Sequence, residues 1–292
     1  MNEAYALEIE LPDSAIALYQ EVIKLSQSIP YKIAEGKGHL YTGIVHSDQG
    51  AYEKAIESYQ NAILIFKTAD HLEGIGSAYI NLGNIENRKA QYGKALAYYL
   101  DGVRIFENLN DTVRMIFAYN NMGATLSEVE QFESSLTYNQ KSLALSRELG
   151  DSLRVCNSLI NIGLIHIHTG QLDNAKVVYK EASLLGEASG DEHVLYLINN
   201  NWCTIYSDEG KFEDALEYAK KSLTYAERLN NPVYISNAYG AIGQVEFNLK
   251  NPESAKYYIQ IGLDLARDSE SIETYMMCLE KMSVFEEASG NS

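Results

Sequence analysis

A small residue returns every 40 positions along the chain, and this period constrains the fold more than any other feature of the sequence. The six positions hold Gly43, Gly83, Gly123, Gly163, Cys203 and Gly243. A second small residue follows each of them by 12 positions, at Ala55, Ala95, Ser135, Ala175, Ala215 and Ala255. Internal repeats of about 20 to 50 residues are typical of stacked arrays, in which each unit packs on its neighbours. The 292 residues therefore predict one elongated domain.

Each repeat has the apolar pattern of a pair of helices. Within residues 36–75, apolar side chains recur at spacings of three and four, at Tyr52, Ala55, Ile56, Tyr59, Ala62, Ile63 and Phe66. Such spacing places them along one stripe of a helix. Residues 36–46 have the same character, and the stretch 47–50 between the two is typical of a turn. We therefore expect each unit to be an αα-hairpin.

The small residues are explained by close packing inside the hairpin. A glycine within a helix costs about 1 kcal/mol relative to alanine, so its repetition indicates that contact between the two helices outweighs this cost. We expect Gly43 to face the region of Ala55. Cys203 is the largest residue at its position, so we expect a slightly wider crossing in that hairpin.

Capping residues recur with the same period. The pairs are Asn110-Asp111, Gly150-Asp151, Gly190-Asp191 and Asn230-Asn231. The first residue of each pair tolerates the left-handed conformation that ends a helix, and the side chain of the second can cap the next helix. We expect helices to stop and restart at these pairs.

The repeat divides the chain into six full units and two partial ones. The full units are predicted at 36–75, 76–115, 116–155, 156–195, 196–235 and 236–275. Residues 1–35 form a partial unit, in which Ala15 and Tyr19 have the pattern of a second helix, and residues 276–292 form a terminal helix. Two explanations stay open: the chain is a fragment of a longer protein, or the terminal helix is a natural cap, which arrays need at their ends.

Composition excludes several classes of partner. The formal net charge of −17 argues against direct binding to nucleic acid or to an anionic membrane, because phosphate groups are bound by clustered lysine and arginine. Cys156, Cys203 and Cys278 have the spacing of neither metal ligands nor a disulfide framework, so we expect reduced core residues. The sequence has no run of 18 apolar residues and no signal peptide pattern. The compartment stays open: the cytoplasm is favoured for a complete chain, and the periplasm is an option for a fragment of a membrane sensor.

The units resemble tetratricopeptide repeats. In the unit 76–115, the family's positions 4, 7, 8, 20 and 24 are matched by Tyr79, Leu82, Gly83, Ala95 and Tyr99. The resemblance implies an all-α fold, a right-handed superhelix of about six helical hairpins plus partial end units. The period of 40 exceeds the family's usual value of about 34, and the closing proline is missing. Longer units of this kind are similar to those of kinesin light chains, cell-polarity adaptors and bacterial signalling proteins whose array precedes a kinase, cyclase or DNA-binding output domain.

One side of each first helix carries the candidate binding residues. Positions 2, 6, 9 and 13 of a unit share this side because they are three or four residues apart, and the resemblance implies that it lines the concave surface of the array. Position 6 is occupied in successive units by Tyr41, Asn81, Asn121, Asn161, Asn201 and Ala241. The strip is extended by Asn84, Arg88, Phe117, Asn120, Asn200 and Asn237. We call this set the asparagine strip.

The asparagine strip has the chemistry to hold an extended peptide. An amide side chain offers one acceptor and two N–H donors, so a ladder of amides can bond a peptide main chain without reading its side chains. Tyr41 and Phe117 add rings as apolar anchors. The alternative is that the amides bond the neighbouring unit and are structural. Capture of a C-terminal carboxylate is disfavoured, because the inner positions offer only Lys37 and Arg88, in different units.

The sequence announces no catalytic, metal or cofactor site. It lacks a glycine-rich phosphate loop, a zinc-binding helix motif and a cysteine pair at ligand spacing. We therefore predict a non-catalytic module that binds a protein or an extended peptide, as the sensing or scaffold region of a larger bacterial signalling protein. Three alternatives stay open. They are a receptor for a short signalling peptide that regulates a linked kinase, cyclase or DNA-binding output, an array that self-associates through its end units, and, least favoured, an enzyme.

Overall fold

A computed structural model describes residues 11–29, 31–269 and 272–288. Within these ranges the chain forms 14 α-helices, α2 to α15, and no strand. This confirms the all-α fold expected from the sequence. The chain divides into two compact parts, Met1–Leu149 and Gly150–Ser292, which we call the N-terminal body and the C-terminal body. Residues 1–10 of the predicted partial unit and 289–292 of the predicted terminal helix lie outside the described residues.

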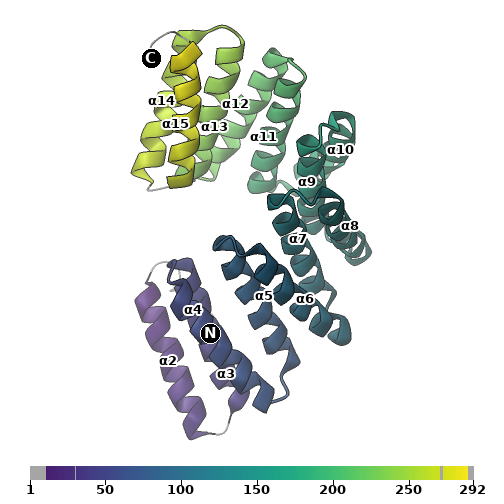
Figure 1. Ribbon diagram of the computed structural model, residues 1–292, viewed down its shortest axis with the longest axis vertical. Coiled ribbons are helices and arrows are strands. Elements are labelled where there is room, and N and C mark those ends of the chain that lie inside the picture. The colour runs from purple at the N-terminus through teal and green to yellow at the C-terminus, as the bar shows by residue number, and fades with distance from the viewer. Residues whose placement is uncertain (1–10, 30, 270–271, 289–292) are drawn as a thin grey trace. The chain divides into compact units, whose positions relative to one another are not determined.

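The described part of the N-terminal body is a stack of helices in chain order, as Figure 1 shows. The helices are α2 (Pro12–Ser28), α3 (Lys32–Asp48), α4 (Tyr52–Thr68), α5 (Leu72–Arg88), α6 (Tyr92–Leu109), α7 (Thr112–Glu128) and α8 (Phe132–Leu149). α3 and α4, α5 and α6, and α7 and α8 pack as hairpins. The first helices of consecutive hairpins also touch, α3 against α5 and α5 against α7.

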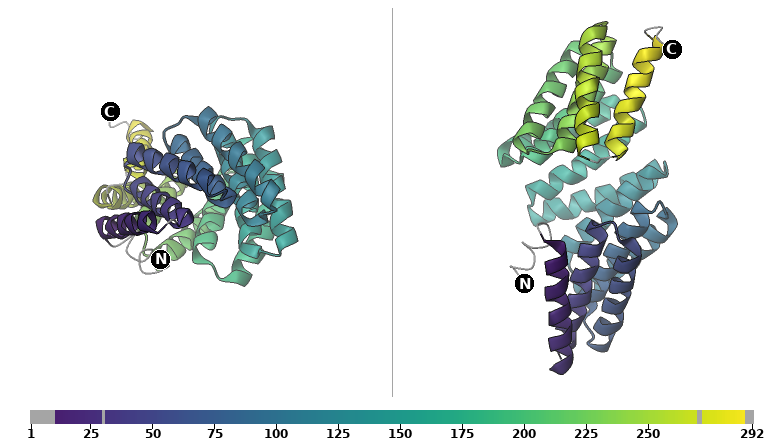
Figure 2. Two further views of the ribbon diagram at one scale, coloured as in Figure 1. Left: turned by 90° about the horizontal axis from the view of Figure 1, so that it is seen from below. Right: turned by 90° about the vertical axis from the view of Figure 1, so that its left-hand side faces the viewer.

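The C-terminal body repeats this arrangement. Its helices are α9 (Ser152–His168), α10 (Leu172–Ser189), α11 (Glu192–Asp208), α12 (Phe212–Arg228), α13 (Pro232–Asn248), α14 (Pro252–Asp268) and α15 (Ile272–Ala288). The hairpins are α9 with α10, α11 with α12, and α13 with α14. In the right-hand view of Figure 2, the yellow α15 stands beside the last hairpin, and it contacts both α13 and α14.

Helix boundaries follow the capping residues. The side chains of Asp111, Asp151 and Asp191 each accept a hydrogen bond, 2.9–3.0 Å long, from the backbone N–H three residues later. Asn110 (φ 53°) and Gly190 (φ 67°) adopt the left-handed conformation that ends the helix before them. The first helices begin at residues 32, 72, 112, 152, 192, 232 and 272, four residues ahead of the predicted unit boundaries.

The recurrent glycine makes room for an aromatic ring on the second helix. A Cβ atom added at Gly43 would lie 2.5 Å from the ring of Tyr59, and one added at Gly83 would lie 2.5 Å from the ring of Tyr99. Gly43 therefore faces Tyr59, and the expectation that it faces Ala55 is wrong by one helical turn. Residues i and i+4 share a helix face, so the sequence pattern alone could not separate the two. Both rings are buried.

One hairpin exchanges the volumes of this pair. In α11 and α12 the small residue is Cys203, and Ala219 occupies the step that holds tyrosine in three other hairpins. Cys203 and Ala219 belong to one buried cluster. The larger thiol and the smaller methyl group compensate each other, since interiors are packed to nearly constant density. The wider crossing expected here stays a prediction.

Candidate functional site

A cavity of about 260 Å³ lies between α5 and α7 in the N-terminal body. Its lining consists of Ser77, Ile80, Asn81, Asn84, Phe106, Arg114, Phe117 and Asn121. Four members of the asparagine strip are among them: Asn81, Asn84, Phe117 and Asn121. α5 and α7 are consecutive first helices in contact, so the period of 40 places equivalent residues on the two sides of the cavity. We call this site the amide groove.

The amides of the groove also tie the two hairpins together. Asn84 Oδ1 accepts one hydrogen bond from Asn121 Nδ2 and another from the Tyr99 hydroxyl, each 2.9 Å long. A second link runs from Thr125 Oγ1 to Asn87 Oδ1 at 2.8 Å. A carbonyl oxygen has two lone pairs, so that of Asn84 is fully used. These bonds leave Asn121 Oδ1 and Asn84 Nδ2 to other partners, and the described structure shows no hydrogen bond from the side chain of Asn81.

The two arginines near the groove are held by the protein itself. Arg88, a predicted site residue, donates from Nη1 to the Ser47 carbonyl oxygen at 3.3 Å, which links α5 to α3. Arg114, which the sequence analysis did not select, pairs with Glu73 at 2.6 Å and with Asp111. Arg114 lies two residues before the unit boundary at 116, outside the positions counted on the first helix. The signal that would have found it is the extension of α7 back to Thr112.

Tyr41 and Asn120 do not line the amide groove. The ring of Tyr41 stacks on Tyr19 with centroids 5.4 Å apart, and both rings line a separate cavity of about 110 Å³ with Tyr31 and Lys37. Asn120 is half-buried and precedes Asn121 on α7. Tyr41 thus belongs to a neighbouring site in the same body.

In the C-terminal body one amide of the strip is more deeply buried than those of the N-terminal body. Asn161 and Asn200 are half-buried, and Asn201 is only 6% exposed. Burial raises the pKa of Tyr196 to about 12, and a hydrogen bond from the Asn237 side chain opposes this rise. Asn237 therefore links α13 to α11, which is a structural contact.

Lys281 is a cation on the same ladder that the sequence analysis missed. It stands 40 residues after Ala241, and its ammonium nitrogen lies 3.4 Å from where a Cβ atom on Gly240 would be. Burial lowers the pKa of Lys281. The ladder was counted over the six full units only, and continuing it into the terminal helix would have found this residue.

Comparison with known proteins places the repeats in a family. A family model described as tetratricopeptide repeat matches residues 38–108 and 114–183. The chain contains tetratricopeptide repeats. No curated protein matches it.

Several solved tetratricopeptide proteins are similar in structure. Aspartyl phosphate phosphatase F from Bacillus subtilis is 14% identical, with a TM-score of 0.70 over 90% of this chain and 73% of that one. A signal transduction ATPase with a tetratricopeptide repeat sensor, from Pyrococcus horikoshii, is 20% identical, with a TM-score of 0.70 over 99% of this chain and 43% of that one. The Rap conjugation gene regulator of the plasmid pLS20, in complex with a Phr peptide, is 15% identical, with a TM-score of 0.68 over 93% and 79%. At these identities the likeness establishes the fold.

Within the described residues, no group of three or more histidine, cysteine, aspartate or glutamate side chains could hold a metal ion. None of the described helices is both long and apolar enough to cross a membrane. Cys156, Cys203 and Cys278 are free thiols, and all three are buried. Burial raises the pKa of Cys156 and of Cys203 to about 11, so these thiols are poor nucleophiles at neutral pH.

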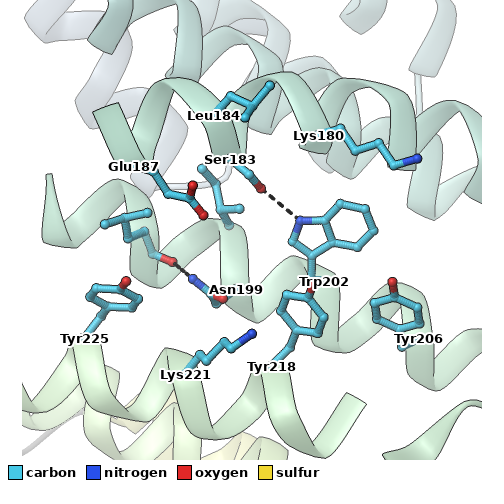
Figure 3. A pocket seen from close by; sticks show the side chains of 12 residues that line it. Lys180, Ser183, Leu184, Glu187, Asn199, Trp202, Tyr206, Tyr218, Lys221 and Tyr225 are labelled. Atoms are coloured by element: carbon cyan, nitrogen blue, oxygen red, sulfur yellow. Dashed lines mark hydrogen bonds between the residues drawn. The ribbon is translucent and has the colours of Figure 1, made fainter. Parts of the chain in front are cut away.

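A larger cavity, of about 590 Å³, lies in the C-terminal body. Its floor is α11 and its walls are the second helices α10 and α12. The lining consists of Lys180, Ser183, Leu184, Glu187, Leu195, Ile198, Asn199, Trp202, Tyr206, Tyr218, Lys221 and Tyr225. Figure 3 shows the side chains of α10 on one side, those of α12 on the other and Trp202 between them. We call this site the aromatic cavity.

The aromatic cavity arises where the tetratricopeptide units of this chain depart from their own pattern. Ser183 occupies a step that holds Ile63, Val103, Leu143, Leu223 and Leu263 in the other units. Asn199 occupies the step of Tyr79, Tyr119 and Tyr239. These two changes remove side-chain volume between α10 and α11. The signal was present in the sequence, but the analysis looked at positions that repeat and not at positions that deviate.

Proposed function

We propose that this chain is a non-catalytic binding module that holds an extended peptide, or an extended segment of a protein, in the amide groove. The observation that carries the proposal is the grouping of Asn81, Asn84 and Asn121 with the exposed ring of Phe117 around one cavity. An amide acceptor, amide donors and an aromatic ring are the groups that a peptide main chain and one apolar side chain require.

The amide groove suggests a division of roles between its members. Asn121 Oδ1 is suited to accept a bond from a peptide N–H, while Asn81 and Asn84 Nδ2 are suited to donate to peptide carbonyl oxygens. Phe117, which is 51% exposed, offers a surface for an apolar side chain. The bonds between Asn84, Asn121 and Tyr99 hold these groups in place before a peptide arrives. Such preorganisation reduces the entropic cost of binding.

The setting we propose is the sensing or scaffold region of a larger bacterial signalling protein. The signal transduction ATPase carries a similar array as a sensor, and this chain spans 43% of its length. A second candidate is a receptor for a short signalling peptide that regulates a linked kinase, cyclase or DNA-binding output. The similarity to a Rap regulator in complex with a Phr peptide favours it.

The proposal is tested with an array of short unstructured peptides, probed with the purified chain, followed by fluorescence anisotropy on the peptides that bind. Asn81→Ala is the sharpest variant, because no hydrogen bond in the described structure depends on its side chain. Loss of one amide contact should weaken peptide binding by about fivefold with no change in the melting temperature. Asn121→Ala together with Asn161→Ala should abolish binding while the helical circular dichroism signal remains.

The matched control is Asn174→Ala, which removes an exposed amide on the second helix α10 and should bind peptides as the parent does. Equal peptide affinity of the parent and the Asn81→Ala chain would contradict the proposal. Melting of the Asn121→Ala and Asn161→Ala double variant would assign the amides to structure instead.

A peptide that binds in the groove should also raise the melting temperature of the parent chain, since it binds only the folded state. This result separates a receptor for a free peptide from a scaffold, which needs a folded partner.

A further inference from the structure

The aromatic cavity lies on the side of α11 opposite the asparagine strip. Successive helix residues are rotated by about 100°. Asn201 of the strip is therefore rotated by about 160° from Asn199 and by about 140° from Tyr206, two residues of the cavity. The amide groove is lined by α5, α6 and α7, and the aromatic cavity by α10, α11 and α12, so the two sites share neither a helix nor a lining residue.

The aromatic cavity is lined by an amide, Asn199, at a step where three other units have tyrosine. In three other units the tyrosine at this step stacks on a tyrosine of the second helix. The centroid distances are 6.1 Å for Tyr79 and Tyr98, 5.9 Å for Tyr119 and Tyr138, and 6.1 Å for Tyr239 and Tyr258. The corresponding second-helix residue here is Tyr218, and its ring partner on α11 is Trp202, with centroids 5.8 Å apart. The amide of Asn199 replaces the tyrosine of the other units in the lining of the cavity.

The rings of α11 and α12 form a fixed wall of this cavity. Trp202, Tyr206 and Tyr218 stack on one another with centroids 5.3–5.8 Å apart. The indole N–H of Trp202 donates to Ser183 Oγ at 3.1 Å, and Asn199 Nδ2 donates to the Leu195 carbonyl oxygen at 2.7 Å, as the dashed lines of Figure 3 mark. Rings in this arrangement favour a further aromatic group, which stacks or meets them edge to face.

Two lysines stand at the rims of the aromatic cavity. Lys180 is exposed on α10, and Lys221 is exposed on α12, where its ammonium group lies 4.7 Å from the centroid of Tyr218 and 2.6 Å from Glu217. Glu187 is the carboxylate of the lining. In a chain of net charge −17, the ammonium group of Lys180, together with that of Lys221 beside Glu217, offers a local site for a carboxylate.

We infer that the aromatic cavity is a second binding site, which takes one aromatic side chain from an acidic segment of a partner protein. The incoming ring packs against Trp202 and Asn199 in the cavity, and carboxylates beside it in the segment pair with Lys180 and Lys221. The volume of about 590 Å³ exceeds that of a single ring and leaves room for the flanking residues of the segment. This site is independent of the peptide-binding role proposed for the amide groove.

The experiment uses the fluorescence of Trp202, which is the only tryptophan of the chain and lines the cavity. The full chain is titrated with acetyl-Glu-Phe-Glu-amide, and with acetyl-Glu-Ala-Glu-amide and acetyl-Lys-Phe-Lys-amide for comparison. We expect a saturable change in emission with the first peptide, and at least tenfold weaker responses with the other two. Equal responses to the phenylalanine and alanine peptides would overturn the assignment of an aromatic anchor.

Two variants fill the cavity with residues that the repeat itself uses. Asn199→Tyr restores the ring of Tyr79, and Ser183→Leu restores the aliphatic group of Leu223. Each should abolish the emission response to the acidic phenylalanine peptide while the far-ultraviolet circular dichroism stays that of the parent. Undiminished binding by a folded Asn199→Tyr chain would refute the site.

A third variant tests the rim without touching the core. Lys180→Glu should weaken binding of the acidic phenylalanine peptide at least fivefold and strengthen that of the lysine-flanked one. An unchanged ratio of the affinities for the two peptides would contradict the role of the rim. Asn174→Ala, which lies outside the lining of both cavities, is the control that should leave all three titrations unaltered. The emission of Trp202 reports on the aromatic cavity alone, so failure of this proposal and failure of the proposed function are separately visible.

Discussion

The amide groove and the aromatic cavity show two ways in which one repeated frame can provide a binding site. The amide groove lies between consecutive first helices and includes Asn81 and Asn121, which recur with the period. The aromatic cavity lies between second helices and includes Ser183 and Asn199, which break the period. The helices around both sites have the same lengths within one residue. The difference therefore comes from side-chain volume and not from the backbone.

Three equivalent positions of the repeat illustrate this difference. They hold Ile63, Phe66 and Tyr79 between α4 and α5, and Ser183, Gly186 and Asn199 between α10 and α11. In the N-terminal body, Ile63 and Phe66 are buried in a cluster against which Tyr79 packs. In the C-terminal body Ser183 and Asn199 line the aromatic cavity, whereas Gly186 packs against Val194 and Ile198. A repeat can thus gain a cavity by losing volume at a few positions while its neighbours keep the stack stable.

The largest predicted change in stability concerns the contact, inside a hairpin, between the small residue of the first helix and the ring of the second helix. Gly83→Cys places the residue of the α11 hairpin against Tyr99, and the clash should lower the free energy of unfolding by about 3 kcal/mol. Tyr99→Ala alone should cost about 3–5 kcal/mol. Together the two changes reproduce the Cys203 and Ala219 pair, so the double variant should lose clearly less than the sum. Urea unfolding of the three variants measures this coupling.

If the losses in free energy of unfolding are additive in the double variant, the larger first-helix residue does not compensate for the smaller second-helix residue. Cys203→Ala is the matched control in the C-terminal body. It removes one sulfur atom from a buried site without creating a clash, and should cost about 1 kcal/mol.

A second, smaller effect concerns the ring step itself. Tyr79→Asn introduces the Asn199 situation into the N-terminal body and should lower the free energy of unfolding by about 2 kcal/mol, through loss of the stack on Tyr98 and of packed surface. Asn199→Tyr makes the reverse change and should raise it by about 1 kcal/mol. Thermal melting of both variants checks the opposite signs. A loss of stability in both would show that the aromatic cavity is shaped by its backbone after all.

The smallest predicted effect is a loss of stability in acid, and its direction should be the same in both bodies. Burial lowers the pKa of His39 in the N-terminal body and of His166 in the C-terminal body, with Glu35 and Gln171 respectively opposing the shift. The unfolded chain then takes up these protons first, so the free energy of unfolding declines as pH falls below about 6.5. The loss ends once the folded pKa values have been passed. Urea unfolding between pH 8 and pH 5, at about one-unit steps, should show this decline, and His39→Gln should reduce it.

Much of the fold was readable from the sequence because the period carries both packing and capping. The spacing of apolar residues gave the helices, and pairs such as Gly190-Asp191 gave their ends. The partner of Gly43 was misassigned, because Ala55 and Tyr59 lie on the same helix face one turn apart. No periodic argument distinguishes them.

The candidate site was less accessible to such reasoning. The grouping of Asn81, Asn84 and Asn121 follows from the period, but the hydrogen bonds among their side chains depend on rotamers that a sequence does not specify. The aromatic cavity depends on missing volume, and Ser183 signals it only when its step is compared across all units. Their use in binding stays a prediction.

The exchange of volumes between Cys203 and Ala219 limits how such an array can change its length. A first helix with a thiol and a second helix with a tyrosine would collide, so helices from different hairpins are not freely interchangeable. Duplication or deletion that cuts inside a hairpin would join mismatched halves, whereas cuts at the turns between hairpins keep matched halves together. The hairpin, and not the single helix, is therefore the piece in which a gene for this chain can grow or shrink without loss of stability.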